Sequence, residues 1–403
     1  MFDKPAVTRI ATAVAWIAAA VSWLPLAVPV FWFGLAIAAA ITVWLARGAR
    51  LRLGWFDVGV ASFCAGAALA SLHALRGDES HIALRSLLAV VLASYLARAM
   101  PGRRASALLA AGVISLGLAV AAGVVVLWAS AGAAKVTPLN GWLYVSTRSV
   151  LDSRWTLPLD PANLAVAAAS LLTPLAFALV ASTSGPRVRG SFLIAAVAFA
   201  SALVVLSVRS AWVAVLGAAV VYGLRFRGRA LRAAGGALAA ALTLFVAAAA
   251  SAPTLFDPGS TLVRVDLWRA SVAILQAGGP VGLGPGMFPY HLIELWRGKA
   301  GTEVFTGPDN ALLQVAGDAG VLGLAGAAIA LFAWARRAWD APPASVLGRG
   351  ALFGLLCYLA FGAFWSVSVV AIRTAEETFA TVAVPFPWLL LGLFYRDTDS
   401  GST

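Results

Sequence analysis

The stretch "GPDNALLQVAGDAGVLG", residues 307–323, passes from a polar segment into a long apolar run. Such a run of about 20 residues is long enough to cross a bilayer, and we predict a membrane-spanning helix over 310–335. Asp309 and Asn310 stand at its start, and both residue types are favoured at helix N-caps. Asp309 is therefore either a cap or a chemical group, and the choice depends on the membrane face where it lies.

The composition extends this prediction to the whole chain. Of its 403 residues, 61% are hydrophobic and 11% are charged, with a mean hydropathy of +0.90. Soluble domains are about 25% charged, so we predict an all-α polytopic membrane protein with a single integral membrane domain over 1–403. The length criterion gives about twelve spans, at 8–24, 27–46, 55–75, 84–100, 106–130, 161–183, 191–207, 210–224, 232–251, 310–335, 349–370 and 378–395.

The connectors between these spans alternate in charge. Arginine-rich connectors lie at 46–54, 98–104, 184–190, 225–232 and 336–349. The other set is longer or mixed in sign, at 76–81, 131–160, 252–309 and 373–378. Because positive connectors stay in the cytoplasm, we place both termini there. The net charge of +12 then fits contact with membrane lipids rather than nucleic acid.

Residues 252–309 form the large outer loop, where polar chemistry can be housed. Within it, residues 260–278 predict an amphipathic helix, because apolar side chains recur at helical spacing at Leu262, Val263, Leu267, Ala270 and Ile274. On such a helix Arg264 and Trp268 share one face. That pair suits a phosphorylated sugar, with the cation on phosphate and the ring against the sugar. The alternative is a surface helix with scattered charges.

Three further features are ambiguous. Arg209 lies in a short outer turn and either anchors the chain at the head groups or binds a phosphate or carboxylate. The segment "GGPVGLGPGMFPYHL", 278–292, is either a backbone nest for an anion or a chain reversal. His291 within it is a possible base or a polar surface residue. At Asp309 the two roles compete, since capping bonds to backbone amides lower the pKa of a carboxyl and make it a poor base.

Taken in order, these residues resemble the O-antigen ligase and polymerase superfamily. The matching pieces are Asp-Pro-x-Asn at 160–163, Ser-x-Arg at 207–209, Arg264 with Trp268, "GLGPGMF" at 282–288, and Asn310 followed by Gly-x-x-Gly at 320–323. The family's last motif normally begins His-Asn, and this chain has Asp309 in place of that histidine. The spans before residue 158 match only in character.

The resemblance implies a GT-C-like inverting glycosyltransferase of lipopolysaccharide biosynthesis in a bacterial inner membrane, working at the periplasmic face without metal or other cofactor. Its donor is a glycan on undecaprenyl diphosphate, and a ligase acts on a lipid A core acceptor. The resemblance implies Arg209 and Arg264 as catalytic residues, and we add Asp309, in the slot of the family's histidine, as a candidate base. Trp268, Arg269, Asn310 and His291 are the expected substrate-binding residues. A repeat-unit polymerase and an O-linked oligosaccharyltransferase are alternatives within this class, and a polysaccharide or lipid transporter is the alternative outside it.

Overall fold

The computed structural model describes the chain in segments. These are residues 10–18, 54–99, 136–139, 142–145, 161–182, 185–205, 258–296, 310–362, 369–373, 379–383 and 385–400, with isolated positions at 37, 112, 214, 215, 217 and 218. The chain divides into two compact units. The first comprises 1–106, 270–342 and 366–403, and the second comprises 107–269 and 343–365.

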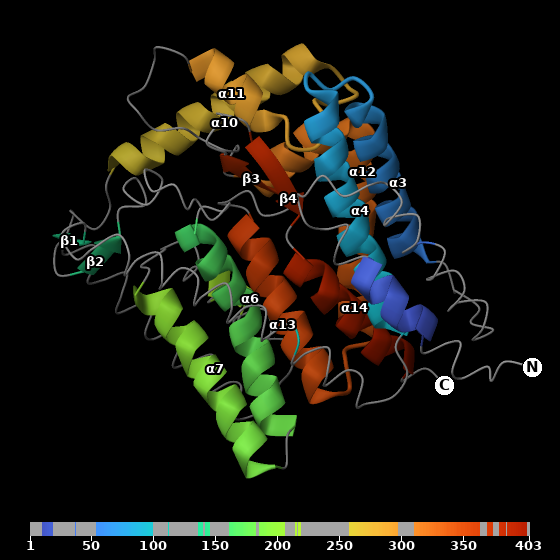
Figure 1. Ribbon diagram of the computed structural model, residues 1–403, viewed down its shortest axis with the longest axis vertical. Helices are drawn as coiled ribbons and strands as arrows, with labels where there is room; N and C mark the ends of the chain where they lie inside the picture. The colour runs from blue at the N-terminus through green and yellow to red at the C-terminus, as the bar shows by residue number, and fades with distance from the viewer. Residues whose placement is uncertain are drawn as a thin grey trace, which may run out of the picture. The chain divides into compact units, whose positions relative to one another are not determined.

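The first unit is built around three helices that lie side by side in Figure 1, namely α3 (Trp55–Ser71), α4 (Gly77–Ala99) and α12 (Ala311–Asp340). Helix α12 packs along α3, and α14 (Pro385–Ser400) packs along α4. The short helix α11 (Phe288–Trp296) contacts α12. An antiparallel hairpin of β3 (Val369–Arg373) and β4 (Phe379–Ala383) also contacts α4.

The second unit contains α6 (Pro161–Ser182), which packs against both α7 (Pro186–Val205) and α13 (Val346–Gly362), as Figure 1 shows. Strands β1 (Val136–Leu139) and β2 (Trp142–Val145) form a second antiparallel hairpin. Helices α6 and α13 approach closely at Gly350. A Cβ atom there would lie 2.6 Å from the Cβ of Ala178 and 3.1 Å from the carbonyl oxygen of Pro174.

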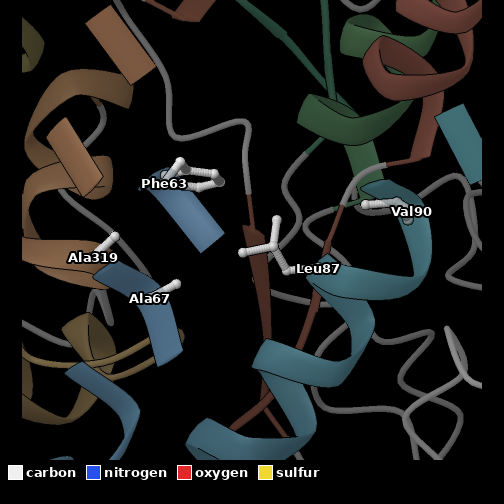
Figure 2. Packing of buried hydrophobic residues seen from close by; sticks show 5 residues of the cluster. All are labelled: Phe63, Ala67, Leu87, Val90 and Ala319. Carbon is white, nitrogen blue, oxygen red and sulfur yellow. The ribbon is translucent and has the colours of Figure 1, made fainter. Parts of the chain in front are cut away.

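Glycine also sets the distance between α3 and α12. A Cβ atom on Gly59 would lie 2.6 Å from the carbonyl oxygen of Gly326, and one on Gly66 would lie 2.6 Å from the amide nitrogen of Gly323. Small residues let two apolar helices bring their backbones together, which is the usual way in which helices associate in a membrane. Beside this contact lies the core cluster drawn in Figure 2, formed by Phe63, Ala67, Leu87, Val90 and Ala319.

One end of the first unit is held by a buried polar network around Asp57. Its carboxylate accepts hydrogen bonds from the Gly54 amide at 2.8 Å, the Tyr95 hydroxyl at 2.7 Å and Arg98 at 3.1 Å. The Arg98 guanidinium also lies 5.0 Å from the ring centre of Tyr395. Gly54 and Arg98 belong to two of the connectors predicted to be cytoplasmic, so the structure places these two connectors at the same end.

The opposite end holds segments from the other set of connectors. There the Arg76 guanidinium, from the turn between α3 and α4, lies 4.4 Å from the ring centre of Tyr290 in α11. Within the first unit, the structure thus places Gly54 and Arg98 at one end and Arg76 at the other, in agreement with the alternation of charge for these connectors. Which side of a membrane each end faces stays a prediction.

Two described helices, Gly77–Arg98 and Ala311–Asp340, are long and apolar enough to cross a membrane. The element bounds depart from the predicted spans in places. Helix α4 begins at Gly77, so most of the predicted connector 76–81 is helical. The predicted span 349–370 includes the start of β3, and the predicted span 378–395 includes all of β4, where β-branched residues favour strand. The predicted spans 27–46, 106–130, 210–224 and 232–251 lie almost entirely outside the described residues, so the number twelve and the single domain stay predictions.

Candidate functional site

The predicted site residues fall unevenly on the described chain. Arg209 and Asp309 lie outside the described residues. Arg264 is described through its backbone alone, as part of α10 (Pro258–Gly278). Trp268 and Arg269 lie on the same helix, His291 lies in the first turn of α11, and Asn310 directly precedes α12.

Helix α10 confirms the predicted amphipathic helix. Leu267, Ala270 and Ile274, three of the five predicted apolar positions, are buried. On another face Arg269 donates a hydrogen bond to Asp266 at 3.3 Å, and the two side chains are 78% and 60% exposed. An ion pair so exposed to solvent contributes little stability. Arg269 therefore keeps its guanidinium at the surface, as a substrate-binding role requires.

Trp268 differs from its charged neighbours. The residue is half-buried, and its indole N–H is buried without a hydrogen-bond partner among the described residues. A buried indole N–H usually has a partner. Trp268 shares a helix face with Arg264 by spacing. An unused donor on that face is consistent with the predicted contact to a sugar hydroxyl, which stays a prediction.

Helix α12 is broken at Gly320, which has φ +64° and ψ −164°. In an unbroken helix the amide of Val321 would donate to the carbonyl of Gly317, four residues earlier. Here the Val321 amide donates instead to the carbonyl oxygen of Pro280 at 2.9 Å. The carbonyl of Gly317 accepts from the amides of Leu283 at 2.6 Å and Gly284 at 3.3 Å. The donor and the acceptor of the hydrogen bond that the break removes from α12, the Val321 amide and the Gly317 carbonyl, thus each find a partner in the loop that follows α10.

This exchange explains the glycines of the loop, residues 279–287. Gly282 has φ +91°, and a Cβ atom there would lie 2.6 Å from the amide nitrogen of Gly320. Gly284 has φ +99°, and a Cβ atom there would lie 2.8 Å from Ser80 Oγ and 2.9 Å from Ala74 Cβ. Only glycine combines positive φ with so close an approach to neighbouring atoms.

The loop amides decide between the two interpretations of the glycine-rich segment. The amide of Gly282 donates to Gly279 at 3.4 Å, and that of Gly286 donates to the Asp318 carboxylate at 3.2 Å. With the amides of Leu283 and Gly284 bound to Gly317, the segment is a chain reversal docked on α12. It is not an open nest for a substrate anion, because these amides already donate to the Gly317 carbonyl and the Asp318 side chain of the protein itself.

Asp318 is the buried acid of this region, and it is absent from the predicted site. Its side chain lies on α12, two residues before the break, and the residue is 2% exposed. An acid inside an apolar run is a functional candidate by default, and this signal was present in "GDAGVLG". Asp309 and Asn310 were favoured instead, because they precede the predicted helix and their residue types are common at helix starts.

Asn310 has a structural role at the start of α12, where the sequence offered both Asp309 and Asn310 as the N-cap. Its side-chain oxygen accepts hydrogen bonds from the amides of Leu312 at 3.0 Å and Leu313 at 3.1 Å, with extended backbone angles of φ −156° and ψ 120°. Asn310 is therefore the N-cap of α12. A role for Asn310 in binding substrate stays a prediction.

The site combines an apolar helix long enough to cross a membrane, broken at Gly320, with a loop docked in the break. Residues 194–328, 135 of the 403, match the protein family described as O-Antigen ligase. This match confirms the resemblance to the O-antigen ligase superfamily. It supports, in general terms, a membrane protein with ligase-type or polymerase-type glycosyltransferase function. No curated protein matches the chain.

Proposed function

We propose that this protein is an inverting O-antigen ligase that moves a glycan from undecaprenyl diphosphate to lipid A core oligosaccharide at the periplasmic face of the inner membrane. The observation that carries the proposal is the match over 194–328. That segment contains Arg209, Arg264, the docked loop and the broken start of α12. The two arginines of the predicted site and the break in α12 that binds the loop thus lie in one segment that matches the family.

The chemistry follows from what leaves the sugar. An acceptor hydroxyl oxygen bonds to the anomeric carbon while the bond from that carbon to the diphosphate oxygen breaks, and the electron pair leaves with the diphosphate. Arg209 and Arg264 stabilise the charge that develops there, which fixed guanidinium groups can do without a metal ion. The hydroxyl proton passes to Asp309, to His291 or to the departing phosphate.

The test measures transfer by purified protein from a carrier-linked glycan to lipid A core. Arg209→Ala and Arg264→Ala should each lower kcat by about 10²–10³-fold, the usual loss when a donor to developing charge is removed. Arg264→Lys keeps the charge but loses the planar fork, so it should restore only part of the rate. Treatment with a chelator should leave the rate unchanged.

The matched control is Arg336→Ala, which removes an arginine that is 73% exposed and that pairs with Asp340, four residues later, at 3.3 Å. It should retain the wild-type rate. Full activity in both Arg209→Ala and Arg264→Ala, in protein that remains folded in detergent, would show that the site assignment is wrong.

The choice of acceptor separates the ligase from its nearest alternatives. A second carrier-linked repeat accepted in preference to lipid A core would identify a polymerase, and a protein hydroxyl would identify an oligosaccharyltransferase. The broken helix and the buried Asp318 are features that transporters also use. A transporter would move the carrier-linked glycan between leaflets of a vesicle without forming a new glycosidic bond, and the product analysis distinguishes the two.

A further inference from the structure

The docked loop has two kinds of attachment to α12. Three hydrogen bonds join backbone to backbone, from Leu283 and Gly284 to the Gly317 carbonyl and from Val321 to the Pro280 carbonyl. The fourth, from the Gly286 amide to Asp318 Oδ1 at 3.2 Å, is a contact to a side chain. The first three hold residues 280–284, and the fourth holds Gly286 in the segment that leads into α11, where the Phe288 ring also packs against Gly317.

Burial of the Asp318 carboxyl group at this position costs free energy, so some interaction must compensate for it. Asp318 is 2% exposed, and burying a carboxyl group in an apolar helix is unfavourable unless a partner compensates. The residue is too enclosed to act as the general base, because an acceptor hydroxyl must come within hydrogen-bond reach of a base. Its bond to Gly286, 32 positions earlier in the chain, also shows that it does not cap its own helix.

The loop is continuous with α10. Helix α10 ends at Gly278, and Gly279 adopts φ +70° while its amide donates to the Leu275 carbonyl at 3.1 Å. This is the geometry of a left-handed helix end, which has few degrees of freedom. Where the loop docks therefore sets where α10 ends.

We propose that Asp318 is a positioning residue for the transfer reaction. By holding Gly286, it keeps residues 279–287 in the break of α12 and so fixes the end of α10, the helix that carries Arg264, Trp268 and Arg269. It also fixes the start of α11, which carries His291. The effect on transfer rests on the proposed function, whereas the effect on the loop does not.

The experiment compares Asp318→Asn with Asp318→Ala in the full-length protein in detergent. Asparagine keeps an oxygen that can accept from Gly286, and alanine does not. In Asp318→Ala we expect the amides of 286–288 to exchange hydrogen about tenfold faster or more. We expect kcat to fall by about 10²-fold with a smaller change in KM, because small displacements of a positioned group act on the transition state.

Asp318→Asn should keep the slow exchange of the loop and most of kcat. The matched control is Asp340, an acid on the same helix that is 60% exposed. Neither Asp340→Asn nor Asp340→Ala should change exchange or kcat. If Asp318→Ala does not fold, Asp318→Ser replaces it, since its shorter hydroxyl does not reach the Gly286 amide.

Two results would overturn the proposal. One is unchanged exchange of the amides of 286–288 in the folded alanine or serine variant. The other is a loss of kcat in Asp318→Asn as large as in Asp318→Ala while the loop stays protected, which would mean that the carboxylate itself acts in the reaction. Hydrogen exchange is measured without donor or acceptor. Absence of transfer by the wild-type protein would therefore count against the proposed function and leave the role of Asp318 to be decided by exchange alone.

Discussion

At the scale of single residues, the start of α12 depends on Asn310, whose side-chain oxygen accepts from the amides of Leu312 and Leu313. A helix has one N-cap residue, so the carboxyl group of Asp309 is not required for this task. A capping carboxylate would have a lowered pKa and would be a poor base. With the cap supplied by the neighbouring amide, that objection to Asp309 as the base no longer applies.

We expect Asn310→Ala to lower the free energy of unfolding by about 1 kcal/mol, the usual cost of losing an N-cap side chain, and Asn310→Asp to retain it. Asp309→Ala, the matched neighbour, should leave stability unchanged and remove transfer if Asp309 is the base. Denaturation in detergent and the transfer assay measure the two effects. A loss of stability in Asp309→Ala but not in Asn310→Ala would contradict the assignment of the cap.

At the scale of elements, α3 and α12 depend on glycines that leave no room for a side chain. A Cβ atom on Gly326 would contact the amide nitrogen of Phe63 and lie 2.6 Å from the carbonyl oxygen of Gly59. Both are backbone atoms of the facing helix, so neither can move aside as a flexible side chain would. The two helices would have to separate along their length, and the dispersion contacts between them would weaken.

Gly326→Ala should therefore destabilise the protein by about 1–3 kcal/mol, as overpacking of a tight contact does. Gly190→Ala on α7 is the matched control, because no atom lies within 4 Å of the added Cβ. There the loss of backbone freedom in the unfolded chain should stabilise by about 0.5–1 kcal/mol. Thermal unfolding in one detergent measures both. A Gly326→Ala variant as stable as wild type would show that the two helices are not in close contact.

At the scale of the whole molecule, one end of the first unit is predicted to face the periplasm and the other the cytoplasm. Asp78, in the first turn of α4, belongs to the end predicted to be periplasmic, and Arg336, near the end of α12, belongs to a connector predicted to be cytoplasmic. The charge argument therefore makes a prediction that does not depend on catalysis.

In a chain whose two native cysteines are replaced by alanine, Asp78→Cys should react with a membrane-impermeant thiol reagent added from the periplasmic side. Arg336→Cys should react only after the inner membrane is opened. Both positions are exposed, so burial does not limit labelling. Labelling of Arg336→Cys from the periplasm, with Asp78→Cys protected, would invert the topology and remove the proposed site from the periplasmic face.

The sequence by itself determined that the chain is rich in apolar helices typical of a membrane protein, that residues 260–278 form an amphipathic helix, and that the connectors ending at Gly54 and beginning at Arg98 share one end. Hydropathy, helical period and charge act over one or two turns, so they can be read from neighbouring residues. The break at Gly320, the docking of the loop and the partner of Asp318 were decided by the tertiary structure. They depend on hydrogen bonds between residues more than 30 positions apart, and no local pattern specifies which distant backbone will satisfy the groups that a broken helix leaves open.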